Sequence, residues 1–181
     1  TGNIVTSFDV IFDTTPPVAV VQMPDEGVFY ERLSVASGTV NADLAGLDGT
    51  NGSRVNLEIR DSFDGAFDGN DLYWNGSSFL AAVDVTTATV TGGPNGTLSW
   101  DYAAAVPYQN RKYRITAKSY DRAGNAETAL SSATFTFNRQ LPTTAITTPS
   151  GLARYSALPT ISGTAADPGS GAMGIKEVHL R

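Results

Sequence analysis

The chain of 181 residues carries 18 acidic and 12 basic side chains, which gives a formal net charge of −6 and a sequence pI near 4.6. Proteins that bind nucleic acid need clustered Lys and Arg, so this charge argues against such a partner and favours cations instead. The lack of cysteine excludes disulfides and thiolate metal sites. No apolar run approaches the ~20 residues of a membrane-spanning helix, so we expect no membrane insertion of this segment.

Alternating apolar and polar residues predict β-strands along the chain, and helical periodicity is hard to find. In chain order, we expect strands at residues 18–23, 33–42, 54–61, 72–79, 81–91, 97–102, 112–120 and 131–138. Within the segment after Arg111, for example, Tyr113, Ile115 and Ala117 share one face, as in an antiparallel strand with one buried side. The chain is therefore predicted to be all-β.

Turn signals separate the predicted strands at short intervals, for example Asn75-Gly76 and Gly124-Asn125. About seven short antiparallel strands with this spacing are typical of an immunoglobulin-like β-sandwich with Greek-key connections. Tyr113 stands at the start of a strand, where it fits the tyrosine corner of that fold, with its hydroxyl bonded to the backbone before the strand. The alternative is an ordinary half-exposed strand tyrosine.

Two long segments of the chain are echoed later in it. These are residues 12–24, echoed by 137–149, and residues 33–43, echoed by 158–167. Gly163, for example, lies 125 positions after Gly38. A period of this length is too long for a solenoid repeat and suits a domain of ~100 residues.

The repeat divides the chain into three parts. Residues 1–13 end one immunoglobulin-like repeat, residues 14–138 form a complete repeat, and residues 139–181 begin the next. Because the last part has only its first strands, we expect it to expose apolar residues such as Ile161 and Ile175. The expected partners are neighbouring repeats of the same chain, with identical chains stacked head to tail in a filament as a further possibility.

Several motifs of the complete repeat occur together in one known family. They are DTTPP at 13–17, LYWNGSSF at 72–79, TLSWDYA at 97–103 and YRITAKSYDRAGNAE at 113–127, with ISGTAAD at 161–167 beyond them. In combination these motifs resemble the immunoglobulin-like repeats of very large secreted or surface-anchored bacterial proteins. The resemblance implies a structural spacer in an extracellular or cell-surface stalk, adhesin or fibre, and it does not imply an enzyme.

Four oxygen-bearing side chains are predicted to meet where the complete repeat joins the preceding one: Asp13, Asp43, Asp121 and Asn125. In a sandwich of this topology, the incoming linker and the loops that hold these residues lie at the same pole. Calcium takes about six to eight oxygen ligands, so the set is sufficient for an ion at the joint, similar to the calcium-stiffened joints of some bacterial arrays. Alternatively, Asp and Asn serve the turns themselves. At the next junction Asn138 replaces Asp13, which predicts weaker ion binding there.

A second acidic stretch, DSFDGAFDGND, holds Asp61, Asp64, Asp68 and Asp71. The calcium loop of an EF-hand requires oxygen ligands at alternating positions, and a loop that starts at Asp68 fails because its fifth position is Leu72. We therefore expect a solvated loop.

Tyr73, Trp74 and Trp100 form an alternative site. Their rings could make a stacking platform for sugars, in which case the protein would be a carbohydrate-binding or adhesive module of a secreted multidomain protein. Strand alternation favours packing in the core or at a strand edge instead.

The sequence does not predict an enzyme. Its one histidine, His179, lies outside the complete repeat, which excludes a Ser-His-Asp or Cys-His arrangement within that repeat. Nothing singles out a pair among the 18 acidic residues as the acid and base of a glycosidase.

Overall fold

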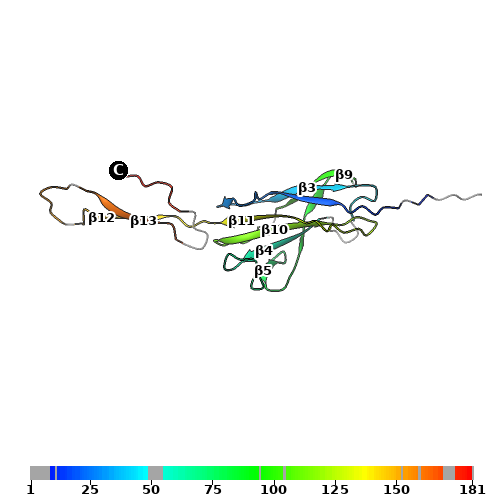
Figure 1. The fold of residues 1–181 in the computed structure, drawn as a ribbon, viewed down its shortest axis with the longest axis horizontal. Coiled ribbons are helices and arrows are strands. Elements are labelled where there is room, and N and C mark those ends of the chain that lie inside the picture. Colours follow the sequence, from blue (N-terminus) through cyan, green and yellow to red (C-terminus); the bar gives the residue numbers. More distant parts are fainter. Residues whose placement is uncertain are drawn as a thin grey trace, which may run out of the picture.

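The structure, a computed structural model, describes residues 9–10, 12–48, 55–93, 95–103, 105–151, 153–158, 160–168 and 174–180. Within these residues the regular secondary structure consists of strands without a helix, so the all-β prediction is confirmed. None of the described segments is a helix long and apolar enough to cross a membrane. Figure 1 shows two layers of strands, with one further pair of strands beyond their end.

The first sheet contains four antiparallel strands. In spatial order they are β1 (Val18–Met23), β3 (Ala36–Ala42), β9 (Gly96–Tyr102) and β8 (Thr89–Thr91). In β3 the side chains alternate between buried and partly exposed, because a pleated strand turns successive residues to opposite faces. One face of this sheet is therefore buried and the other meets solvent.

The second sheet faces the first. In spatial order its strands are β2 (Phe29–Tyr30), β11 (Ser131–Phe137), β10 (Arg111–Ser119), β4 (Val55–Ser62), β5 (Leu72–Trp74) and β6 (Phe79–Leu80). The short strand β7 (Thr86–Thr87) also pairs with β4. β2 runs parallel to β11, whereas every other pair in both sheets is antiparallel. Because β1 belongs to the first sheet and β2 to the second, the chain changes sheets between these two strands.

A shared hydrophobic core lies between the two sheets. Its largest buried side chains come from both, with Trp100 and Val40 in the first sheet and Tyr113, Phe135 and Phe137 in the second. The rings of Tyr113 and Phe135 stack with their centroids 5.6 Å apart. Burial of each large apolar side chain stabilises the fold by about 2 kcal/mol. The architecture is consistent with a β-sandwich.

Gly38 allows the strands of the first sheet to pack closely. A Cβ atom at this position would lie 1.9 Å from the carbonyl oxygen of Val20 and 2.6 Å from the ring atom Cζ2 of Trp100. The indole occupies that space, and its Nε1 donates to the carbonyl oxygen of Thr39 at 3.1 Å. Glycine is required here because any side chain would collide with backbone.

The tyrosine-corner prediction is confirmed. The hydroxyl of Tyr113 accepts a hydrogen bond of 2.7 Å from the backbone N–H of Gln109, just before β10. It also lies 3.4 Å from Oδ2 of Asp61, to which it donates. Burial raises the pKa of Tyr113, so the phenol stays protonated and keeps this donor. The alternative of a half-exposed tyrosine is wrong, because the side chain is fully buried.

The strands differ from the predicted ones mainly where the side chains are small or polar. The expected strands at 72–79 and 81–91 are divided into β5, β6, β7 and β8, because turns interrupt them. The two-residue strand β2 was not predicted, since so short a segment carries no alternation.

The remaining strands, β12 (Thr143–Thr148) and β13 (Ser162–Ala166), pair with each other and reproduce the pairing of β1 with β3. Each of the pairs recurs 125 positions later, from Val18–Asn41 and Thr143–Ala166 at one end to Met23–Ser37 and Thr148–Ser162 at the other. The register shifts before the last pair in both cases. The sequence echo is therefore matched by an echo in backbone pairing.

Candidate metal centre

Asp13, Asp43 and Asp121 meet at one end of the sandwich, as the sequence predicted. Asp13 lies in the linker before β1, Asp43 directly follows β3, and Asp121 lies in the turn between β10 and β11. One carboxylate oxygen of each residue lies within 4.8 Å of the other two. Asp121 is buried, with 3 % of its surface exposed, whereas Asp13 and Asp43 are half-buried.

Asp13 connects the linker to the loop after β3. Its Oδ1 accepts a hydrogen bond of 2.9 Å from the N–H of Thr15, which forms a local turn of the kind that Asp favours. Its Oδ2 accepts a hydrogen bond, also of 2.9 Å, from the N–H of Ala45. One side chain therefore fixes both the exit direction of the linker and its attachment to the sandwich.

Asn125 closes the site from the turn after β10. Its backbone N–H donates to Oδ1 of Asp121 at 2.7 Å, and its side-chain Nδ2 donates to Oδ2 of Asp121 at 2.7 Å. The same Nδ2 donates to the carbonyl oxygen of Asp13 at 3.1 Å. In this arrangement the amide acts as a donor, and a role as a metal ligand, which stays a prediction, requires the amide to turn over.

The two half-buried carboxyls have unequal acidity. Backbone hydrogen bonds, first from Thr15 and then from Ala45, lower the pKa of Asp13 despite partial desolvation. The adjacent carboxyl of Asp13 raises the pKa of Asp43, and desolvation raises it further. Oδ1 of Asp43 is buried and has no hydrogen-bond partner among the described residues. The site therefore favours either a proton on Asp43 or a cation between the carboxylates.

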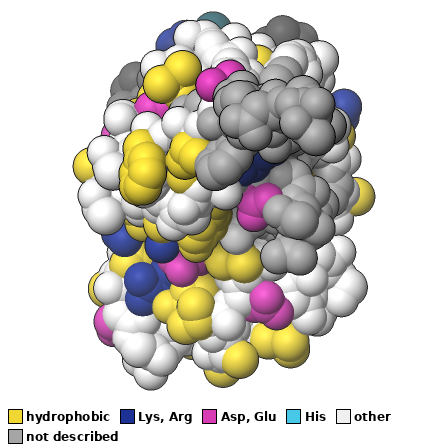
Figure 2. Space-filling view, turned by 90° about the vertical axis from the view of Figure 1, so that its right-hand side faces the viewer, with side chains coloured by type: hydrophobic (Ala, Val, Ile, Leu, Met, Phe, Trp, Pro, Cys, Tyr) yellow, Lys and Arg dark blue, Asp and Glu magenta, His cyan; other side chains and the backbone are white. Residues whose placement is uncertain are grey.

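The donor set suits a hard cation such as calcium. Calcium binds carboxylate oxygens and tolerates irregular geometry, and here three carboxylates each bring one oxygen within 4.8 Å of the other two. Figure 2 views the molecule from the end at which the chain enters the sandwich. There, acidic side chains stand singly among basic and hydrophobic ones. On the visible part of this face, the local cluster is therefore the feature that would attract a cation.

Glu127 is a structural carboxylate for which the sequence analysis assigned no role. It is buried, and its Oε1 accepts a hydrogen bond of 3.0 Å from the N–H of Ala19 in β1. Its Oε2 accepts hydrogen bonds from the N–H and the hydroxyl of Ser119 in β10, at 3.1 and 2.9 Å. Glu127 thus joins the two sheets next to the candidate metal centre. Its only sequence signal was its place at the end of the motif YRITAKSYDRAGNAE.

The sugar-stacking alternative is wrong for both tryptophans. Trp74 and Trp100 are only 3 % and 1 % exposed, so neither ring face can contact a ligand. The indole Nε1 of Trp74 donates to the hydroxyl of Tyr102 at 2.7 Å within the sandwich. Tyr73 is half-buried, and the guanidinium of Arg60 lies 5.4 Å from the centre of its ring. Strand alternation had favoured this packing role.

The acidic stretch at residues 61–71, which runs from the end of β4 through the loop before β5, is only partly solvated, and this corrects the prediction for two of its four aspartates. Asp61 and Asp71 are buried and form ion pairs with Arg111, at 3.4 Å, and with Arg60. Burial raises the pKa of Asp61, and the charge of Arg111 opposes that shift.

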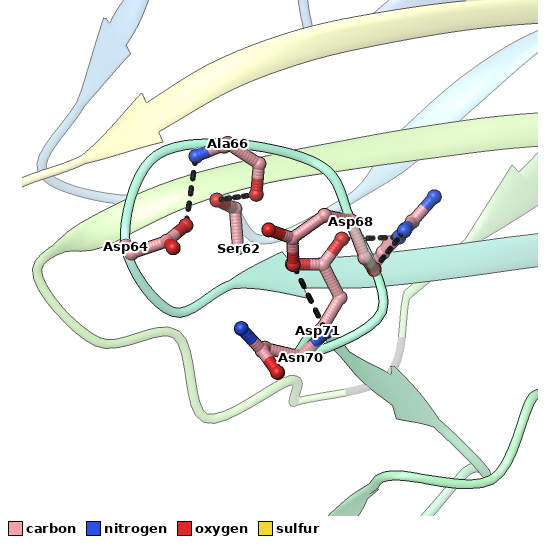
Figure 3. A network of polar contacts seen from close by, with 7 residues as sticks. Ser62, Asp64, Ala66, Asp68, Asn70 and Asp71 are labelled. Carbon is pink, nitrogen blue, oxygen red and sulfur yellow. Dashed lines mark hydrogen bonds and ion pairs between the residues drawn. The ribbon is translucent and has the colours of Figure 1, made fainter.

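The other two aspartates of this stretch, Asp64 and Asp68, lie in the loop, are exposed and shape its turns. Figure 3 shows Asp64 accepting from the N–H of Ala66 and Asp68 accepting from the N–H of Asn70, at 3.0 and 2.9 Å. The four carboxylates therefore serve ion pairs and turns.

Comparison of the chain with protein-family models and with curated protein sequences finds no match.

Proposed function

We propose that residues 14–138 form one immunoglobulin-like module of a tandem array, and that the array serves as a spacer in a large bacterial extracellular or cell-surface protein. Such a protein would be a stalk, an adhesin or a fibre. The strand orders β1-β3-β9-β8 and β2-β11-β10-β4-β5-β6 support the immunoglobulin-like Greek key. In that fold the first, second, fifth and fourth strands form one sheet in that order, and the third, sixth and seventh form the other. The buried tyrosine corner at Tyr113 also supports it.

The observation that carries the tandem proposal is the repeated register of β1–β3 and β12–β13, offset by 125 positions in every pair. Two side-chain details recur at the same offset. Tyr30 accepts from the N–H of Asp25 at 2.9 Å, and Tyr155 accepts from the N–H of Ser150 at 3.0 Å. A recurrence of both register and side-chain contacts is expected of successive copies of one module.

A spacer needs joints that do not collapse, and the linker before β1 has the features of a stiff one. Pro16 and Pro17 restrict the backbone dihedral φ, and Pro17 is buried against the module. The hydrogen bonds of Asp13 to Ala45 and of Asn125 to Asp13 hold the residue before the prolines. A linker that is fixed at successive points keeps neighbouring modules extended, unlike a Gly/Ser coil.

We further propose that calcium binds between Asp13, Asp43 and Asp121 and locks this joint. The residues on which the proposal rests converge from the linker and from two loops, so an ion would connect all three segments. At the following junction Asn138 keeps the local turn, because its Oδ1 accepts from the N–H of Gln140 at 2.8 Å, as Asp13 does from Thr15. A neutral amide supplies less attraction for a cation, so the second joint should depend less on calcium.

The spacer proposal is tested with chains that contain one, two and three successive copies of residues 13–137, so that every joint keeps Asp13. Small-angle X-ray scattering should give a maximum dimension that grows by equal steps with each copy. Compact particles, or growth that follows the square root of the copy number as in a flexible coil, would contradict the proposal.

The calcium proposal is tested by thermal unfolding with calcium and with a chelator. An ion that binds only the folded state at about one hundred times its Kd stabilises it by about 2.7 kcal/mol. Asp43→Asn should remove the response to calcium, whereas Asp64→Asn, in a loop outside the site, should keep it. Equal melting temperatures of the unaltered protein in calcium and in chelator would remove the ion from the joint and leave the spacer proposal standing.

A further inference from the structure

Residues 80–85 form an exposed apolar segment within the complete module. They run from the last residue of β6 to the residue before β7, and their sequence is LAAVDV. Leu80, Val83 and Val85 are 45, 69 and 46 % exposed, and the three residues between them are exposed as well. Because an exposed run of apolar residues promotes association, a stable surface carries one where it meets a partner.

The backbone of this segment is open as well. Within the described part of the chain, residues 81–85 take part in no backbone–backbone hydrogen bond. The opposite edge of the sandwich, at β1, is closed, because the N–H groups of Ala19 and Val21 there donate to side-chain oxygens. A satisfied N–H group offers no donor to an added strand, so the two sides of the sandwich differ in what they can accept.

The segment lies away from the joints between repeats. The pairings of β4, β5 and β6 place Leu80 at the level of Arg60, and the other end of the segment lies beside Leu57, which pairs with Thr86. Both levels are in the middle of β4. In the proposed array, repeats join at the two ends of the sandwich, so a neighbour in the same chain does not cover its side. The exposure of the segment is therefore independent of where an array begins or stops.

We propose that residues 80–85 pair two copies of this chain side by side, segment against segment, about a twofold axis. The inference rests on the proposed tandem function, because a contact of this size gains strength by repetition. Six residues are far fewer than the ~20–30 residues a side of a stable interface. A partner array with the same period of 125 residues can add such contacts together, and a second copy of the chain has that period.

The charge of the segment fits a twofold contact. Asp84 is its one charged residue. With the axis at Val83, two antiparallel segments bring Val83 against Val83 of the second copy and Asp84 against Ala82 of the second copy, so the carboxylates stay apart. A parallel contact in register would place the two Asp84 carboxylates opposite each other, which is unfavourable. The twofold arrangement is therefore apolar at its centre.

The test is oxidative cross-linking of the full chain. Because the chain has no cysteine, a single introduced thiol reports contacts between copies. Val83→Cys places the thiol on the proposed axis, where directly opposite Cβ atoms lie about 5 Å apart, close to the span of a disulfide. The disulfide-linked dimer should form at least about tenfold faster than from Ser132→Cys, which alters an exposed serine in β11 away from the segment.

A second substitution in the Val83→Cys chain makes the contact specific. Val85→Asp adds a carboxylate to the segment and should reduce the cross-linking rate to that of the Ser132→Cys chain. Its matched control is Thr97→Asp, which adds the same charge at an exposed position of β9 and should leave the rate within about twofold. Both altered positions are exposed, and the melting temperature of each variant shows whether the fold is kept.

Three outcomes would overturn the inference: equal cross-linking rates of the Val83→Cys and Ser132→Cys chains, a rate that Val85→Asp leaves unchanged, or loss of the excess rate at about 0.5 M sodium chloride. The last would show a contact between opposite charges, because salt screens charges and does not weaken apolar contacts. These outcomes do not bear on the growth of scattering dimensions with copy number, so a failure here is distinguishable from a failure of the spacer function.

Discussion

Asp13 accepts a hydrogen bond of 2.9 Å from the backbone N–H of Ala45, although the two residues are 32 positions apart in the chain. The contact attaches the linker to the loop after β3, at the point where two further carboxylates approach. The direction in which the chain enters the module is therefore set by the folded module itself. Substitutions at Asp13 and at the carboxylates near it therefore test how the linker is held.

Substitutions of Asp13 should separate its two hydrogen bonds. Asp13→Ala removes both acceptors, so amide exchange at Thr15 and at Ala45 should accelerate at least about tenfold. Asp13→Asn retains one oxygen and should protect Thr15 in the way that Asn138 protects Gln140. If Ala45 exchanges at the same rate in all three proteins, its hydrogen bond to Asp13 does not hold the linker.

Asp43 should make stability depend on pH in the absence of calcium. Because the pKa of Asp43 is raised in the folded state, its favourable contribution is fully present below the ordinary pKa of 3.8 and is lost as pH rises through the raised value. The opposite holds for Asp13, whose lowered pKa gives a contribution that is present above 3.8 and lost as pH falls through the lowered value.

In chelator at pH 7, Asp43→Asn should therefore raise the melting temperature, because it removes a carboxylate from beside Asp13. Near pH 3 the difference between the two proteins should largely disappear, since Asp43 is then protonated. Thermal unfolding monitored by circular dichroism at both pH values measures this. A variant that is less stable than the unaltered protein at pH 7 in chelator would show that the two carboxyls do not repel.

Glu127→Ala should destabilise the sandwich strongly. The substitution leaves the buried N–H groups of Ala19 and Ser119 without an acceptor, at a cost of about 3 kcal/mol or more in the free energy of unfolding. Urea unfolding followed by tryptophan fluorescence measures the loss. The matched control is Glu58→Ala in β4, where a partly exposed carboxylate is removed and the change should stay within about 0.5 kcal/mol. Equal effects of the two substitutions would argue against Glu127 as a connection between the sheets.

Gly38→Ala and Gly163→Ala form a second matched pair. The added methyl group at Gly38 collides with the carbonyl of Val20 and with the indole of Trp100, so the free energy of unfolding should fall by roughly 1–3 kcal/mol. At Gly163 the collision is confined to β12, and the main unfolding transition of the sandwich should be unchanged. A shared loss of main-transition stability would indicate that the β12–β13 pair belongs to the same cooperative unit.

Local sequence patterns predicted the long strands well. The expected strands at 54–61, 112–120 and 131–138 are found within one residue as β4, β10 and β11, because alternation of side chains along a strand depends only on neighbouring residues. The echo at a spacing of 125 positions is matched in the structure, where β12 pairs with β13 as β1 pairs with β3. The strands of two or three residues were not predicted individually, because so short a segment carries no alternation.

The environment of individual charged and aromatic groups was less predictable. Four aspartates stand in one acidic stretch of the sequence, DSFDGAFDGND. Only Asp61 and Asp71 are buried beside arginines, whereas Asp64 and Asp68 are exposed. Trp100 was open to two interpretations until the glycine opposite it was placed. Burial of such groups is decided by what packs on them from other strands.

The sequence by itself determined the all-β class and the alternation that sorts core from surface, which depend on residues close to one another in the chain, and it showed the repetition of a segment directly. Only the tertiary structure decided that Asp61 and Asp71 are buried beside arginines and that Glu127 joins β1 to β10. The physical reason is distance along the chain: Ala19 and Glu127 are 108 positions apart, and their contact exists only after both sheets have formed and packed.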